Sequence, residues 1–276
     1  MRAGAQCKLR RLAGIGGLGS APAVEAVEMS SLAAANEFVE LTQCATTNDQ
    51  LRDALEAICQ SMGFDYFALT HHVDPRASQA QAIRLHNYPE PWVAWFDEHR
   101  LGVSDPMHRA SRVTDAGFRW ARVPSMIKLT TADREVLAMA RREGVGDGFT
   151  VPWHIPGEAS GSCSFAVRPG SEVPEDYVLV AQLVGTYAFA AARRVNHIRL
   201  VEADGPPLTG RQRDCVLWAA RGKTNWETAK ILGLSEETVT QHHKQARERL
   251  DIPNRVMLVL RALYDGYFCF DDVFHA

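Results

Sequence analysis

Hydrogen-bonding side chains gather on one stretch near the C-terminus, residues 236–250, whose spacing is that of a helix. Thr240, Gln241 and Lys244 share the outward face of its first half, where Gln can pair with adenine and Lys with guanine in a major groove. Arginines and a lysine around the stretch are placed for phosphate oxygens. This pattern predicts recognition of DNA. The expected DNA contacts are Thr224, Thr238, Thr240, Gln241, His242, Lys244, Arg247 and Arg255, with Lys223 and Arg249 as further phosphate contacts.

Helix start and stop signals mark the elements that must hold this stretch. Thr209 with Gln212, and Thr224 with Glu227, form two capping boxes, each of which opens a helix. Both helices end at glycines, and Ser235 is placed to cap the third helix after a turn of three residues. Two helices joined by such a turn form a helix-turn-helix unit, whose second helix enters the major groove.

A fourth helix is predicted from Pro253-Asn254 to about Gly266, which completes a four-helix domain over residues 208–270. A solvated basic face is the simpler interpretation of one amphipathic helix, but the capped four-helix pattern favours DNA binding. The residues expected to form the apolar core of this domain are Leu208, Val216, Leu217, Ala219, Ile231, Leu232, Leu234, Val239, Ala246, Leu250 and Val259.

Motifs within residues 206–268 resemble the LuxR-type helix-turn-helix of bacterial transcription regulators. They are Leu208-Thr209-Gly210-Arg211-Gln212, Gly222-Lys223-Thr224, Leu232-Gly233-Leu234-Ser235 and Asn254-Arg255. Two residues depart from that family: Gln212 stands where Glu is usual, although it can still close the capping box, and Gln245 stands where Asn is usual. The resemblance implies promoter DNA, a second copy of the chain and RNA polymerase as partners.

Residues 29–203 show mixed helix and strand patterns, which predict the α+β class. Helical spacing covers about residues 32–42, 51–62, 90–100, 131–143 and 175–202, and strand patterns cover 64–70, 82–86, 118–120, 149–155 and 162–167. Because strands and helices do not alternate strictly, we expect an α/β/α sandwich on an antiparallel or mixed sheet. Residues 204–207 are the predicted linker and residues 1–28 a predicted disordered tail. Its Gly14–Gly19 run lacks the strand and helix of a dinucleotide loop.

The N-terminal half lacks the strand-Asp-helix repeats of a receiver domain and carries no Walker A motif. Tyr88, Trp92, Asp105-Pro106 and Trp120, with Gly161 and Ser164 further on, look like the pocket signature of LuxR-type receptors for N-acyl homoserine lactones. This resemblance implies that residues 29–203 form an autoinducer-binding domain and that the chain is a ligand-responsive transcription factor of quorum sensing.

The chemistry of such a ligand fits these side chains. The Trp92 indole N–H suits the lactone carbonyl, an ionised Asp105 suits the amide N–H, and the Tyr88 and Ser164 hydroxyls suit the amide carbonyl. Trp120 offers a flat face for the lactone ring. The residues expected to line the acyl chain are Phe67, Ala68, Leu69 and Thr70. A mostly apolar pocket with a few polar groups is typical of small-molecule sites.

Each aromatic residue, taken singly, is more often part of an apolar core than a ligand contact, and Asp105 before Pro106 fits a helix cap. The combination favours a ligand site. An empty pocket is then expected to leave the Asp105 carboxylate and the Trp92 indole unpaired, so ligand binding should stabilise the domain. The alternative is a LuxR-type regulator that responds to another small molecule or acts without ligand.

Composition excludes several other classes. With 46% hydrophobic and 23% charged residues, the chain has the balance of a globular protein, and charged residues interrupt every apolar run that might span a membrane. Six scattered cysteines without a CxxC pair indicate reduced thiols in a cytoplasm and no metal site. His71-His72 and Cys163-Ser164 are candidate catalytic groups, but no GxSxG or HExxH surrounds them. We expect neither catalysis nor a cofactor.

Overall fold

A computed structural model describes residues 23–73, 82–155, 159–198 and 206–274, without the side chains of residues 23–31. Contacts divide the chain into two compact units, Met1–Arg199 and Leu200–Ala276. The predicted tail of residues 1–28 is wrong at its end, because α1 begins at Ala23. The remainder of that tail, with its glycine run, lies outside the described residues.

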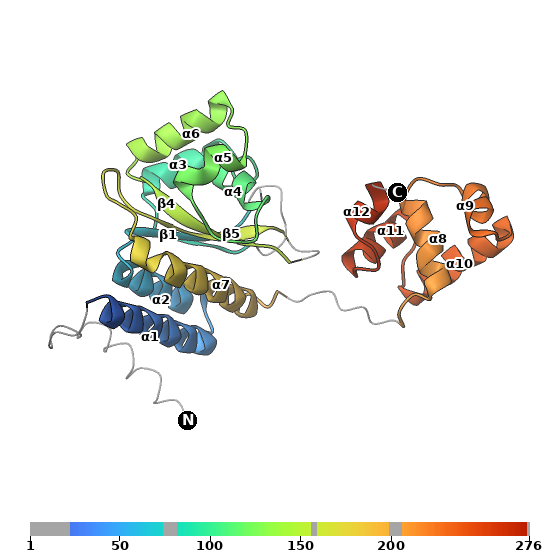
Figure 1. Cartoon of the computed structure of the whole chain (residues 1–276), viewed down its shortest axis with the longest axis horizontal. Coiled ribbons are helices and arrows are strands. Elements are labelled where there is room, and N and C mark those ends of the chain that lie inside the picture. The colour runs from blue at the N-terminus through green and yellow to red at the C-terminus, as the bar shows by residue number, and fades with distance from the viewer. Residues whose placement is uncertain (1–22, 74–81, 156–158, 199–205, 275–276) are drawn as a thin grey trace. The chain divides into compact units, whose positions relative to one another are not determined.

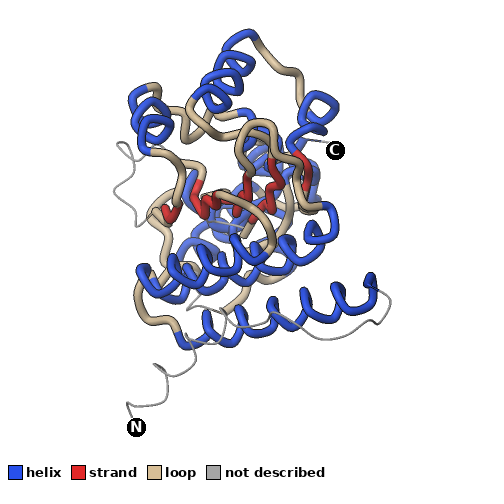
Figure 2. Tube along the Cα trace, turned by 90° about the vertical axis from the view of Figure 1, so that its left-hand side faces the viewer, coloured by secondary structure: helices blue, strands red, loops and turns tan. Residues whose placement is uncertain are grey.

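The N-terminal unit is an antiparallel sheet between two groups of helices. The strands are β1 (Tyr66–His71), β2 (Arg84–His86), β3 (Phe118–Arg119), β4 (Gly148–Trp153) and β5 (Gly161–Ala166), in the spatial order β2-β1-β5-β4-β3. The helices are α1 (Ala23–Cys44), α2 (Asn48–Ser61), α3 (Glu90–Glu98), α4 (Pro106–Ser111), α5 (Val123–Met126), α6 (Thr131–Arg142) and α7 (Val178–Val195). Helices α1, α2 and α7 lie on one face of the sheet and α3 to α6 on the other (Figure 1), and Figure 2 shows the strands between these layers. This arrangement confirms the predicted sandwich.

Several elements differ in extent from the sequence prediction. The strand expected over residues 118–120 ends at Arg119, and Trp120 begins a short 3-10 helix, Trp120–Arg122. The helix expected over residues 175–202 begins with a 3-10 turn and continues as α7, which ends at Val195. Residues 199–202 lie outside the described residues.

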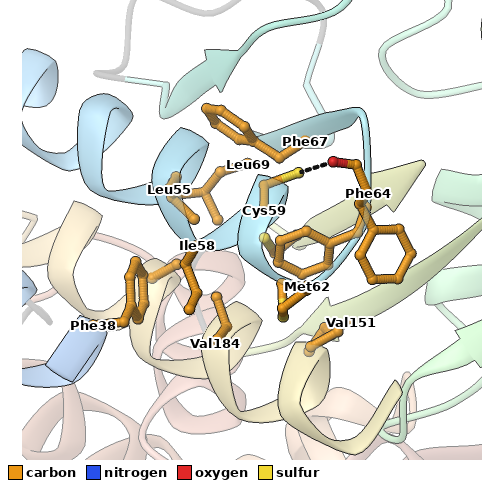
Figure 3. Close-up of a cluster of buried hydrophobic side chains, with 14 of the residues drawn as sticks. Phe38, Leu55, Ile58, Cys59, Met62, Phe64, Phe67, Leu69, Val151 and Val184 are labelled. Carbon is orange, nitrogen blue, oxygen red and sulfur yellow. Dashed lines mark hydrogen bonds between the residues drawn. The ribbon is translucent and has the colours of Figure 1, made fainter. Parts of the chain in front are cut away.

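The main core lies between the sheet and the layer of α1, α2 and α7. Figure 3 shows Phe38 of α1, Ile58 of α2 and Val184 of α7 in this cluster, with Val151 of β4. Gly185 permits the close approach of α7, since an added Cβ would lie 2.8 Å from the Val151 side chain. This face of the sheet is therefore filled by the protein itself.

Strand register places a row of side chains on the opposite face. Ala68 of β1 pairs with His86 of β2 and with Ser164 of β5, and Ser164 pairs with Thr150 of β4. Residues directly opposite one another in an antiparallel sheet project to the same side. The row His86, Ala68, Ser164, Thr150 thus crosses four strands beneath α3, α4 and α6.

The C-terminal unit contains the predicted helices α8 (Gly210–Ala220), α9 (Asn225–Leu232), α10 (Glu236–Arg249) and α11 (Arg255–Tyr264), and also a short α12 (Phe270–Phe274) that we did not predict. Both predicted capping boxes are present, and the Ser235 side chain caps α10 as expected. Gly233 adopts the left-handed conformation, φ 66°, that ends α9.

The core of this unit agrees with the expected apolar set in part. Val216, Val239 and Ala246 are buried. Ile231 is 44% exposed, and Leu258 is buried where we expected its neighbour Val259 to be. Val259 itself packs against this core but is only partly buried. The five consecutive apolar residues 256–260 do not show which side of α11 faces the core.

Candidate functional site

Seven of the nine residues predicted to contact a ligand line one cavity between the sheet and α3, α4 and α6. We call it the Asp105 cavity. Its lining includes the predicted Ala68, Thr70, Tyr88, Trp92, Asp105, Trp120 and Ser164. The prediction is wrong for Phe67 and Leu69, which alternate to the opposite face of β1 and lie in the main core. Val136 and Ala140 of α6 supply apolar wall. The fold thus brings together side chains that are almost 100 residues apart in the sequence.

Asp105 is held at the beginning of α4. Its side chain, on a residue that is 6% exposed, accepts hydrogen bonds at Oδ1 from the backbone N–H groups of Met107, at 2.8 Å, and His108, at 3.1 Å. The expectation that an empty pocket leaves this carboxylate unpaired is therefore wrong, because the helix N-terminus satisfies it. Since both bonds end on Oδ1, Oδ2 keeps its acceptor capacity for a ligand N–H.

Trp120 and Ser164 are joined through Thr150, a fully buried residue that sequence reasoning missed. The Trp120 indole N–H donates to Thr150 Oγ1 at 2.8 Å, and Thr150 Oγ1 lies 2.8 Å from Ser164 Oγ. When the Thr150 hydroxyl donates its hydrogen bond to Ser164 Oγ, the Ser164 hydroxyl can in turn donate a hydrogen bond into the cavity. Gly148 allows the Trp120 ring to approach β4, since an added Cβ would lie 2.9 Å from it.

Tyr88 and Trp92 lie on the α3 side of the cavity. Trp92 is 6% exposed and stacks on Trp95, with ring centroids 5.7 Å apart. Burial, and then the charge of Asp105, raise the pKa of Tyr88, so its hydroxyl stays protonated and able to donate. Among the described residues, neither the Trp92 indole N–H nor the Tyr88 hydroxyl has a hydrogen-bond partner. These are the donors that a buried carbonyl oxygen requires.

A second space adjoins the Asp105 cavity and shares six lining residues with it: Ala68, Thr70, Tyr88, Trp92, Phe96 and His108. We call it the Arg84 cavity, because Arg84 and His86 of β2 line it, with Val73, Val93 and Gly102. Sequence reasoning missed both β2 residues. Arg84 and His86 alternate with Leu85, which was the available signal for a strand. In a strand of three residues, however, alternation does not tell which side faces the cavity until the pairing with β1 is known.

The predicted DNA contacts fall into two groups. Gln241 and Lys244 are exposed on α10, the side chain of Lys244 to 61%. Thr238 is half-buried and Thr240 is exposed, but both hydroxyls form hydrogen bonds within the unit. The Thr238 hydroxyl bonds with Ser235 Oγ, and the Thr240 hydroxyl donates to the Glu236 carbonyl. Thr224 is exposed and caps α9, and His242 is half-buried.

The remaining two predicted contacts, Arg247 and Arg255, also donate hydrogen bonds within the unit. Arg247 donates to the Pro253 carbonyl at 3.1 Å. Arg255 donates to Asn225 Oδ1 at 3.2 Å and to the Lys223 carbonyl, while Asn225 Nδ2 donates to Thr240 Oγ1 at 2.9 Å. Asn225, another residue that sequence reasoning missed, thus ties α9 to both α10 and α11 and fixes the orientation of α10.

No group of three or more His, Cys, Asp or Glu side chains is placed to hold a metal ion within the part of the chain that the structure describes. Among the same residues, no helix is long and apolar enough to cross a bilayer.

Comparison with known proteins finds two family models that cover this architecture. The autoinducer binding domain matches residues 47–194, more than half of the chain, and the luxR family of bacterial regulatory proteins matches residues 206–262.

Individual relatives match both units. The chain is similar to the transcriptional activator protein AhyR of Aeromonas hydrophila, 26% identical over 83% of this chain and 90% of the relative, and to the transcriptional activator protein VanR of Vibrio anguillarum, 27% identical over 83% and 95%. A crystal structure of Escherichia coli SdiA has the same fold, with a TM-score of 0.55 and 24% identity over 86% of this chain and 98% of that one.

Proposed function

The chain belongs to the LuxR family of bacterial transcriptional regulators that carry an autoinducer-binding domain, and we propose that its effector is an N-acyl homoserine lactone bound in the Asp105 cavity. Regulators of this family are not enzymes, and their small molecule is an effector rather than a cofactor. The proposal assigns Tyr88, Trp92, Asp105, Trp120, Ser164, Ala68 and Thr70 to the ligand.

One observation carries this proposal: one acidic acceptor and several donors converge on a cavity that is otherwise apolar. An acyl homoserine lactone offers one amide N–H and two carbonyl oxygens. Asp105 Oδ2 matches the N–H, the Trp92 indole matches one carbonyl, and the Tyr88 and Ser164 hydroxyls match the other. A ligand that pairs the Trp92 and Tyr88 donors gains about 0.5–1.5 kcal/mol for each net hydrogen bond.

For the DNA, we propose that α10 enters the major groove, with Gln241 and Lys244 at base edges and Arg247 near phosphates. Thr224, Thr238, Thr240, His242 and Arg255 complete this surface as positioning residues or phosphate neighbours. A single recognition helix reads one half-site, so we propose a homodimer. Val256, Met257 and Leu260 support this, because they form an exposed apolar face on α11. RNA polymerase as a further partner and a cytoplasmic location are also proposals, consistent with promoter binding.

The test is the melting temperature of the full chain with a panel of acyl homoserine lactones of increasing chain length. At a ligand concentration 100-fold above Kd, binding stabilises the native state by about 2.7 kcal/mol, a large fraction of a domain's stability. A clear rise with one or more lactones supports the proposal. No rise with any lactone, for a chain that is folded and binds promoter DNA, would contradict it.

A second candidate is a regulator of this family that folds and acts without ligand. It is favoured by the two backbone hydrogen bonds that satisfy Asp105 Oδ1 from within the protein. Promoter binding that is equally tight with and without lactone would support this candidate.

A further inference from the structure

The Arg84 cavity is the direction in which a ligand anchored in the Asp105 cavity extends. The six residues common to both cavities place them side by side. Of the polar anchors, Asp105, Trp120 and Ser164 line the Asp105 cavity alone, whereas Tyr88 and Trp92 stand where the two cavities meet. This inference rests on the proposed function: if a lactone occupies the Asp105 cavity, the Arg84 cavity receives the far part of its acyl group.

The Arg84 cavity presents polar side chains at the place where the far end of a hydrocarbon acyl chain would lie. Thr70 and Arg84 are directly opposite one another on β1 and β2, and Ala68 and His86 form the next such pair on the same face. The His86 ring lies beside Tyr88, with centroids 6.4 Å apart and planes 24° apart. An acyl chain that runs from Ser164 across β1 to β2 therefore meets an imidazole and a guanidinium.

His86 lacks a partner for a buried ring atom. Its Nδ1 has no hydrogen bond to any described residue, although the atom is buried. Burial, and then the positive charge of Arg84, lower the pKa of His86, so the ring is neutral and holds one donor and one acceptor. A hydrocarbon tail packed against this ring would give its nitrogens no partner, whereas a hydroxyl could form a hydrogen bond with the ring.

The charge of this region favours a neutral group over an anion. Arg84 pairs with Asp97 of α3, Nη2 to Oδ1 at 2.7 Å, and both side chains are half-buried. The guanidinium is therefore already neutralised, and a carboxylate at the end of the ligand would be placed near Asp97. Val93 and Phe96 of α3 provide apolar contact for the methylene groups before that end.

We propose that the Arg84 cavity selects an acyl group with a neutral oxygen at its far end, and that His86 is the specificity-determining residue that bonds this oxygen. Arg84 contributes a second donor while it holds Asp97.

The experiment uses the full chain and matched pairs of homoserine lactones with hexanoyl, octanoyl and decanoyl groups, each compared with its ω-hydroxy analogue. Affinities come from ligand-dependent melting. Wild type should bind the hydroxylated member of the best-fitting pair about 2- to 10-fold more tightly, as expected for one net hydrogen bond. His86→Phe should reverse that preference and bind the hydrocarbon member at least as tightly as wild type does. Leu179→Ala, a change at an exposed residue of α7 on the opposite side of the sheet, should keep the wild-type preference.

Three results would overturn this assignment or its basis. Wild type that binds the hydrocarbon member of every pair as tightly as its analogue overturns the selection. A His86→Phe variant that loses affinity for both members equally shows a packing role only. No stabilisation by any lactone overturns the proposed function itself, and the assignment with it.

Discussion

The carboxylate of Asp105 accepts a 2.8 Å hydrogen bond from the backbone N–H of Met107, so one acidic side chain both begins α4 and faces the cavity. The cap holds the carboxylate in place before any ligand arrives. A substitution at this position consequently changes two properties, helix stability and ligand recognition, and the two can be separated by the choice of replacement.

We expect Asp105→Ala to reduce the free energy of unfolding by about 0.5–2 kcal/mol, the usual cost of a lost N-cap, and to abolish the lactone response. Asp105→Asn should keep the cap, since Asn is an equally good N-cap residue, but should lose the acceptor for the ligand N–H. The measurements are melting without ligand and lactone-dependent reporter output. A full lactone response in the Asn variant would contradict the assigned role of Asp105.

Thr150 is expected to control the Asp105 cavity without lining it. Thr150→Val removes the acceptor of the Trp120 indole and should destabilise the N-terminal unit by about 1–3 kcal/mol, besides weakening ligand binding through Ser164. Thr150→Ser retains the hydroxyl and should restore ligand affinity in large part. Calorimetric melting and ligand titration test both variants, and equal affinities for Val and Ser would exclude a role for the hydroxyl.

Acid is expected to destabilise the N-terminal unit through His72. This buried ring stacks on His108 at a centroid distance of 3.9 Å, and its Nε2 lies 2.8 Å from Ser162 Oγ. Burial, and then the charges of His108 and Arg112, lower the pKa of His72 well below its usual 6.5. As the pH falls, His72 therefore takes up its proton in the unfolded chain at a higher pH than in the folded chain. The free energy of unfolding should keep its full value above pH 6.5 and fall progressively below it.

The measurement is melting from pH 7.5 to 5.5. His72→Gln can keep a hydrogen bond to Ser162 but cannot titrate, so its stability should fall less over this range than that of wild type. His99→Gln replaces an exposed histidine and serves as the matched control. Identical pH dependence in wild type and His72→Gln would show that His72 is not responsible.

On DNA, Lys244→Ala should relax base preference at one position of the half-site by about 1–3 kcal/mol, because its side chain is exposed and only an exposed ion pair with Glu248, at 3.9 Å, has to be given up to reach a base edge. Arg247→Ala should weaken binding to all sequences evenly and reduce the salt slope by about one unit. Fluorescence anisotropy with a set of single base-pair variants measures both effects. Arg141→Ala, in the N-terminal unit, removes a charge elsewhere and should leave both unchanged.

Asn225 should matter for DNA affinity even though its polar atoms face the protein. Asn225→Ala removes the bonds to Thr240 and Arg255 that fix α10 against α9 and α11. We expect weaker binding to every sequence and a lower melting temperature of the C-terminal unit. Asn225→Asp keeps the acceptor for Arg255 and should lose less stability than the Ala variant.

Local signals in the sequence were sufficient to predict much of this molecule. The caps at Thr209, Thr224 and Ser235 were predictable because each depends on residues at most three positions apart. The Thr150 link and the β2 contribution to the cavity were not, because each depends on strand register between distant segments. The internal bonds of Arg255 could not be predicted either, because an arginine beside a recognition helix looks alike in the sequence whether it faces DNA or protein.

Alternate side chains of β1 project to opposite faces of the sheet and so have two different roles. Phe67 and Leu69 fill the main core, whereas Ala68 and Thr70 face the cavity. Single-codon changes at the latter two positions can therefore retune which chemical message the receptor accepts while the scaffold keeps its packing.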